Sequence, residues 1–105
     1  MISVTPAAAK QIQVSAQQGN SANMPLRVAV TRMEDGSFHY AMGFDDTRRE
    51  DDNTFRSEGI DIVVAPQSLE LLNGTVVDYV ELDDGKWEII FINPNDPVQK
   101  QGSSD

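Results

Sequence analysis

The first 25 residues carry apolar positions at helical spacing. Thr5 and Pro6 form a typical helix start, because threonine caps free backbone amides and proline is favoured at the first helical position. Apolar residues then recur three and four positions apart, at Ala9, Ile12 and Ala16,. Gly19 ends this pattern. The sequence therefore predicts one long helix whose narrow, alanine-rich stripe packs closely against a sheet.

From Leu26 onward the pattern alternates with a period of two, which is typical of half-buried strands,. Leu26, Val28 and Val30 share one face of the first predicted strand. The pair Asp35-Gly36 is a strong signal for a tight turn between strands. A second alternating run then extends over residues 38–44. We therefore expect the two strands to form a hairpin.

The rest of the chain divides into short elements. They are a charged loop at 45–53, strands at 54–56 and 60–64, a short helix from Pro66, and strands at 75–82 and 86–92 joined by a turn at 83–85. Such an order predicts a single α+β domain with a mostly antiparallel β-sandwich or barrel, one long N-terminal helix and one short helix. We expect the domain to cover residues 1–97 and residues 98–105 to form a disordered tail.

Charge and composition exclude several classes of function. The 105 residues have a formal net charge of −9, and all 17 acidic residues lie beyond residue 33. This balance argues against binding to nucleic acid or to anionic membranes, which basic surfaces favour. No apolar run approaches the roughly 20 residues that cross a bilayer, and no secretion signal is evident, so we expect a cytoplasmic protein. Because the chain has no cysteine, disulfides and thiolate sites are excluded.

The remaining polar residues do not assemble an enzyme. His39 is the only histidine, and it lies on the same predicted strand as Ser37, so a converging catalytic triad is not expected there,. We interpret His39 as a surface or partly buried residue. The acidic loop at 45–52 lacks the ligand spacing and central glycine of a calcium-binding loop, and Arg48-Arg49 interrupts it.

The order of motifs resembles the HesB-like A-type iron–sulfur cluster carriers, the group of IscA, SufA and ErpA. The resemblance covers nearly the whole chain, and no single motif carries it. The matching segments are Thr5-Pro6-Ala7-Ala8, Glu50-Asp51-Asp52 with Phe55 and Gly59, Asn73-Gly74-Thr75, Asp78-Tyr79-Val80-Glu81 and Phe91-x-Asn93-Pro94-Asn95. The resemblance implies a HesB-like domain over residues 1–97.

The three cysteines that bind the cluster in this family have no counterpart here. With Tyr40 as the anchor, the resemblance places them at Asp35, Gln99 and Gln101. Thiolates are soft anionic ligands, whereas a glutamine amide is neutral and binds iron poorly. We therefore expect no cofactor and no metal, and without a bridging cluster we expect a monomer. Cysteine-free relatives of this kind are known within sulfur-oxidation gene sets.

Two functional hypotheses follow from the resemblance. The first is an accessory module that binds another protein or regulates one, with a candidate partner surface at Arg32, Glu34, Asp35, Arg48 and Arg49. The alternative is a protein that binds iron or another divalent cation through carboxylates in cluster assembly, with Glu34, Asp35 and the 45–52 loop as candidate ligands. An enzyme is the least favoured class.

Overall fold

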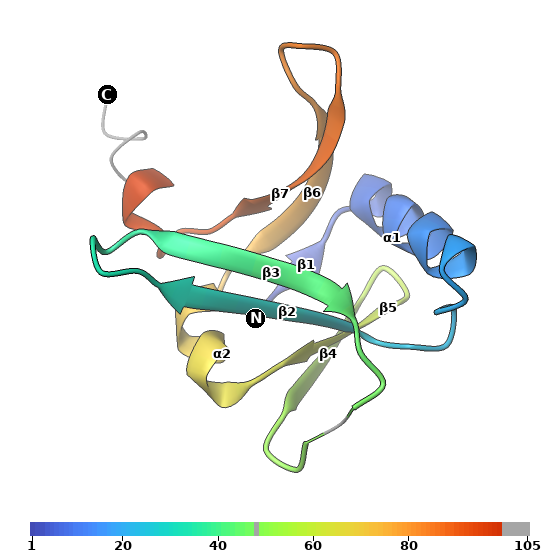
Figure 1. The fold of residues 1–105 in the computed structure, drawn as a ribbon, viewed down its shortest axis with the longest axis horizontal. Helices are drawn as coiled ribbons and strands as arrows, with labels where there is room; N and C mark the ends of the chain where they lie inside the picture. Colours follow the sequence, from blue (N-terminus) through green and yellow to red (C-terminus); the bar gives the residue numbers. More distant parts are fainter. Residues whose placement is uncertain (48, 100–105) are drawn as a thin grey trace.

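The N-terminal helix forms where the sequence predicts it. In the computed structural model, which describes residues 1–47 and 49–99, the short strand β1 (Ser3–Val4) leads into α1 (Pro6–Gln18). The Thr5 side chain caps the helix by accepting a hydrogen bond from the Ala8 amide at 3.1 Å. The residues that α1 buries are Ala8, Ala9, Ile12 and Ala16. The predicted stripe is thus confirmed, and it lies against the strands of both sheets (Figure 1).

In the described residues, seven strands form two small sheets. One sheet has the order β1-β6-β7, with β6 at Val76–Glu81 and β7 at Trp87–Ile92. The other has the order β3-β2-β5-β4, with β2 at Leu26–Arg32, β3 at Phe38–Phe44, β4 at Asn53–Ser57 and β5 at Ile60–Val64. The short helix α2 spans Pro66–Leu72. Both predicted hairpins form, and the α+β class is confirmed.

Each sheet contains one parallel pairing, which the hairpin signals in the sequence do not indicate. β1 pairs parallel with β6, and β2 pairs parallel with β5, while the other neighbours are antiparallel. The sheets form a sandwich-like arrangement, and the described strands do not close into a barrel (Figure 1).

A buried serine joins α2 to β2. The Ser68 hydroxyl accepts a hydrogen bond from the Val30 amide at 3.2 Å and donates to the Val30 carbonyl at 3.3 Å.

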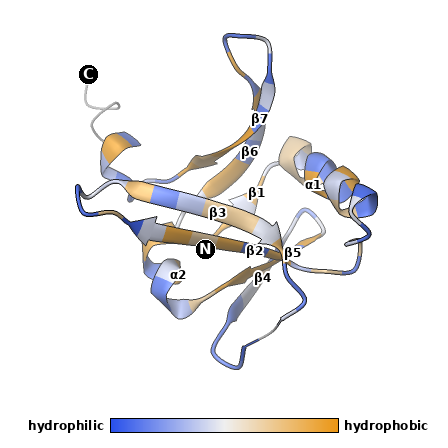
Figure 2. Ribbon diagram, viewed as in Figure 1, coloured by the Kyte–Doolittle hydropathy of each residue, from blue (hydrophilic) through white to orange (hydrophobic). Residues whose placement is uncertain are grey.

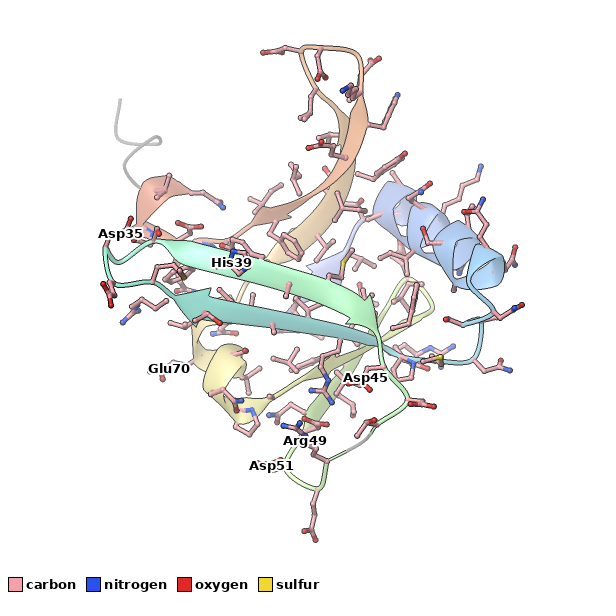
Figure 3. All side chains as sticks on the ribbon, viewed as in Figure 1. Asp35, His39, Asp45, Arg49, Asp51 and Glu70 are labelled. Atoms are coloured by element: carbon pink, nitrogen blue, oxygen red, sulfur yellow. The ribbon has the colours of Figure 1, made fainter. Side chains whose placement is uncertain are left out.

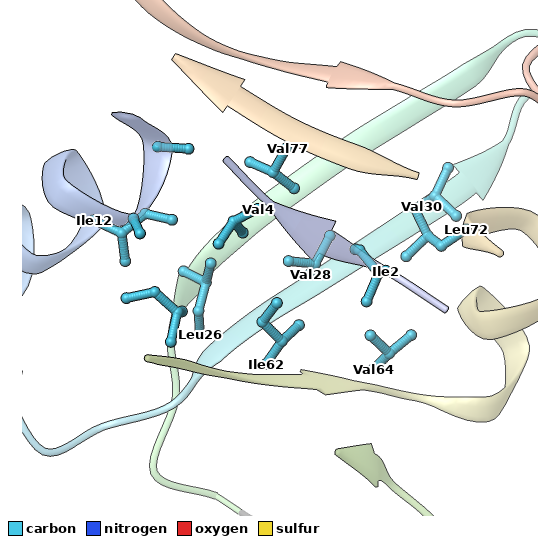
Figure 4. Close-up of a cluster of buried hydrophobic side chains, with 13 residues drawn as sticks. Ile2, Val4, Ile12, Leu26, Val28, Val30, Ile62, Val64, Leu72 and Val77 are labelled. Atoms are coloured by element: carbon cyan, nitrogen blue, oxygen red, sulfur yellow. The ribbon is translucent and has the colours of Figure 1, made fainter. Parts of the chain in front are cut away.

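The apolar core lies between the two sheets and α1. Figure 2 shows the hydrophobic stretches along the strands and α1, and Figure 4 shows buried apolar side chains meeting around β1. The fully buried members include Ile2, Leu26, Val28, Ile62, Val64, Leu72 and Val77. This core is built from aliphatic side chains, and the aromatic residues pack around it as a partly buried layer.

The described chain continues past the expected domain boundary at residue 97. Residues 97–99 form a helical turn, and Gln99 takes part in hydrogen bonds with the end of β7. The rest of the tail, from residue 100, lies outside the described residues, and so does Gln101.

Candidate functional site

Asp35 lies in the tight turn between β2 and β3 and is used to form it. Its carboxylate accepts hydrogen bonds from the hydroxyl of Ser37 at 2.6 Å and from the Ser37 amide at 2.9 Å. These bonds, the hydroxyl first, lower the pKa of Asp35 below its ordinary value,. Gly36 adopts a φ of 87°, which a side chain would disfavour,. The segment is an ordinary hairpin turn with its acid facing solvent.

Gln99 is folded back onto the end of β7, where its side-chain amide replaces missing strand partners. Its Oε1 accepts a hydrogen bond from the Asn93 amide at 2.9 Å, and its Nε2 donates to the Phe91 carbonyl at 2.9 Å. A longer contact of 3.4 Å joins Nε2 to Asp96. Both polar atoms of the Gln99 amide are therefore occupied by the protein itself.

A buried polar network links this C-terminal turn to β3. The Tyr40 hydroxyl donates to Asp96 Oδ2 at 2.7 Å, and the Nδ2 of buried Asn93 donates to the Tyr40 hydroxyl at 3.2 Å. Asp96 is 5% exposed and also caps the Val98 amide at 3.0 Å. Burial and the neighbouring Asp96 carboxylate raise the pKa of Tyr40 to about 12,. The Tyr40 ring stacks on Phe91 at 4.7 Å.

Arg27 holds the acidic loop that follows β3. Its guanidinium bonds to Asp45 at 2.6 Å, to Asp52 at 2.7 and 3.1 Å, and to the Thr47 carbonyl at 3.1 Å. Hydrogen bonds from Arg27, together with one from the Arg49 amide, lower the pKa of Asp52 to about 2. Hydrogen bonds to Asp52 and Asp45 in turn raise the pKa of Arg27. The loop is therefore organised around one cation. This role of Arg27 has no signal in the sequence, because Arg27 and Asp52 lie 25 positions apart in the chain.

Comparison with known proteins decides the family. Residues 1–95 match the family described as iron–sulphur cluster biosynthesis. The chain belongs to this family. It is 37% identical over 91 residues to the iron–sulfur cluster insertion protein ErpA of Yersinia enterocolitica, covering 87% of this chain and 79% of that one. It is also 42% identical over 77 residues to a protein of Aquifex aeolicus, covering 73% of this chain and 66% of that relative.

Solved structures of family members share the fold. A crystal structure of IscA with the [2Fe-2S] cluster superposes with a TM-score of 0.77 at 31% identity, covering 90% of this chain and 86% of that one. The crystal structure of Escherichia coli SufA gives a TM-score of 0.70 at 26% identity, with the same coverage. The sandwich-like α+β arrangement is thus that of the IscA and SufA structures.

The residues that the resemblance assigns to the cluster-ligand positions do not have the chemistry to bind an iron–sulfur cluster. Asp35 offers a hard oxygen ligand that is already bonded within its turn, and Gln99 offers a neutral amide whose atoms are both bonded internally,. Over residues 1–47 and 49–99 no three histidine, aspartate or glutamate side chains gather as metal ligands would. The chain has no cysteine at all. This family member therefore lacks a thiolate cradle.

The structure separates the residues of the candidate partner surface. Arg32, Glu34 and Asp35 lie at the turn end of the β2–β3 hairpin. Arg49 lies in the 45–52 loop, beyond the other end of the hairpin, and Figure 3 shows it far from Asp35. Seven-residue strands separate the two ends by about 20 Å,. Arg48 lies outside the described residues. The same separation parts Glu34 and Asp35 from the loop carboxylates of the alternative hypothesis.

Two further sequence predictions concern His39 and membrane-spanning segments. His39 is exposed on β3, as the sequence predicts. Within the ranges that the structure covers, neither helix is both long and apolar enough to cross a membrane.

Replacing Arg27 by glutamine is expected to lower the melting temperature, because Asp45 and Asp52 lose their cation. The Asp52 side chain is 0% exposed. Its folded-state pKa of about 2 lies below the ordinary value of 3.8. The ion pair therefore stabilises the fold fully above about pH 4, and this contribution is lost as the pH falls towards 2. The difference in melting temperature between the two proteins should shrink over that range.

Arg56→Gln is the matched control, because the Arg56–Asp61 pair has a distance of 3.5 Å and both side chains are exposed,. Thermal unfolding followed by circular dichroism at several pH values gives the melting temperatures of the wild type and both variants. Equal melting temperatures for wild type and Arg27→Gln at pH 7 would contradict the role assigned to Arg27.

Proposed function

We propose that this protein is a member of the carrier family that does not carry clusters. It acts as an accessory module in the cytoplasm that binds or regulates another protein. The observation that supports the proposal is the state of Gln99, which the resemblance aligns with a cluster ligand: its side-chain amide is bonded to Phe91 and Asn93. With no cysteine in the chain, the fold is present without its cluster ligands.

We further propose that the module serves dissimilatory sulfur oxidation. The support is the resemblance to the cysteine-free members of the family known from sulfur-oxidation gene sets, the DsrR type. In this role the protein is not an enzyme and works as a monomer, because no cluster bridges two copies. Loss of the gene from its host should slow sulfur oxidation while leaving the activities of general iron–sulfur enzymes unchanged.

Anaerobic reconstitution with iron and sulfide is the direct test of the first proposal. The purified protein is expected to gain no stoichiometric visible chromophore after desalting, because it offers no thiolate to the cluster. A cysteine-bearing family member treated in the same way is the positive control. The measurement is the iron and sulfide content per chain together with the absorption spectrum.

A chromophore with stoichiometric iron and sulfide that survives desalting would overturn the proposal. Iron without sulfide, bound in a saturable way, would instead favour the carboxylate alternative.

A further inference from the structure

β3 is an open sheet edge without the usual protection. It lies at the end of its sheet, beside β2 only, and its sequence FHYAMGF contains no lysine, arginine, acid or proline. Soluble proteins usually guard a long apolar edge with such residues, because free backbone groups pair readily with another strand. In this protein the edge is seven residues long.

The hydrogen-bond register shows which backbone groups of β3 are free. The Asp45 amide donates to the Pro25 carbonyl, and the Met33 amide donates to the Ser37 carbonyl. In an antiparallel ladder every second residue turns its backbone towards its neighbour. The odd-numbered residues of β3 therefore face β2. Met42 and Phe44 turn their amides and carbonyls outward.

β7 presents a second free edge at the end of the other sheet. The Leu82 amide donates to the Lys86 carbonyl, which fixes the same alternation on this hairpin,. Trp87, Ile89 and Phe91 accordingly turn their backbone groups away from β6. Gln99 bonds to the Phe91 carbonyl, so the free part of this edge lies at Trp87 and Ile89.

An apolar groove of about 450 Å³ lies between these two edges, with α1 forming its third side. Its apolar lining comes from Ile12, Met42, Phe44, Tyr79, Trp87 and Ile89. Beyond the Met42 end, the stacked rings of Tyr40 and Phe91 join the two sheets. Trp87 is 53% exposed and Met42 39% exposed, so large apolar surface in the groove faces solvent,.

The charge around the groove indicates what covers it. The β6–β7 hairpin, which contributes Glu88 to the groove lining, carries four exposed acids, Glu81, Asp83, Asp84 and Glu88, against the single Lys86. The whole chain has a net charge of −9. A second copy would bring like charge to this rim, whereas a basic partner would be attracted. Unpaired backbone groups beside apolar pockets favour an extended segment.

We propose that the groove binds an extended segment of another protein, with alternating apolar side chains and flanking lysines or arginines, as an added strand on β3. The backbone of the segment pairs with Met42 and Phe44, and its inward side chains contact Trp87. This inference rests on the proposed function, the binding of another protein, and adds the surface and the chemistry of the partner. It does not depend on whether a cluster can be reconstituted.

Binding is tested first with an array of synthetic peptides of about nine residues, the span of a long strand. The peptides carry apolar residues at alternate positions and lysine or arginine at both ends. Scrambled peptides of the same composition, and peptides with glutamate at the ends, are the controls. The intact protein is expected to retain the alternating basic peptides over both controls. Equal retention of all three sets would overturn the proposal.

The edge is then tested by titrating the best alternating peptide, labelled with a fluorophore, against two variants. Met42→Pro removes an outward amide that no ladder bond uses, a position where strands tolerate proline. It is expected to weaken binding at least about tenfold, whereas Met42→Ala, which keeps the amide, should change it by less than about threefold. Similar losses in both variants would contradict strand pairing.

Two measurements keep the proposal testable if Met42→Pro does not fold. Glu81→Gln combined with Glu88→Gln is expected to weaken peptide binding several-fold, and raising the salt from about 0.05 to 0.5 M should do the same for the wild type. Affinity unchanged in both would overturn the charge argument.

Sedimentation of the wild type tests whether a second copy occupies the groove. We expect no dimer, and a dimer that Met42→Ala or Met42→Pro disrupts would assign the groove to a second copy instead.

Discussion

Replacing Asn93 by alanine is expected to destabilise the protein by about 3 kcal/mol, because several buried polar groups lose their hydrogen-bond partner at once. Asn93 is 1% exposed, and its Nδ2 donates to the Leu71 carbonyl at 2.8 Å and to the Tyr40 hydroxyl. Its Oδ1 accepts from the Asn95 amide at 2.9 Å. The side chain thus connects α2, β3 and the C-terminal turn. Urea denaturation followed by circular dichroism measures the loss.

Asn23→Ala is the matched control, because Asn23 is an exposed residue in a turn. It should change the free energy of unfolding by about 0.5 kcal/mol or less. A loss below about 1 kcal/mol for Asn93→Ala would show that the network does not hold the C-terminal turn in place. The position of Gln99, and with it the main support for the proposed function, would then need another explanation.

Ile62→Ala is expected to cost about 4 kcal/mol, because it leaves a cavity in the centre of the core. Ile62 is 0% exposed on β5 and belongs to the cluster that joins the two sheets (Figure 4). This core contains no cofactor ligand. The expected result therefore also tests whether the fold is stable without a bound metal or cluster. Urea denaturation in the presence of a chelator measures it.

Ile92→Ala is the control of the same chemistry, because Ile92 lies on β7 and is 47% exposed. It should cost about 1 kcal/mol or less. Equal costs at both positions would contradict the placement of the core. A wild type that unfolds when chelator alone is added would contradict the independence of the fold from metal.

Most of the local structure could be predicted because it depends on near neighbours. The cap at Thr5, the hairpin turns at 35–36 and 83–85, and the short helix at Pro66 all form as the sequence predicts. The parallel pairings of β1 with β6 and of β2 with β5 were not predicted, since alternation shows that a segment is a strand but not which strand lies beside it,.

The candidate site was predicted only in part. The resemblance identified Asp35 and Gln99 as replacements for ligands, but it could not show that both side chains are already engaged. The candidate partner surface also grouped Asp35 with Arg49, although the two lie beyond opposite ends of the β2–β3 strands (Figure 3). The role of Arg27 in holding the acidic loop was not predicted, because a lone arginine in an alternating strand has no signature in the sequence.

The sequence by itself determined the secondary elements, the resemblance to the carrier family and the lack of every thiolate ligand, because each of these depends on residue type and local spacing. Only the tertiary structure decided how Gln99 is held, how Arg27 organises the acidic loop, and that the open edges of β3 and β7 border one apolar groove. Gln99 bonds to residues near it in the chain, but only because the turn at 93–99 folds back onto β7. The contacts of Arg27 need β2 to lie beside β3 within its sheet, and the groove forms only where the two sheets and α1 pack together.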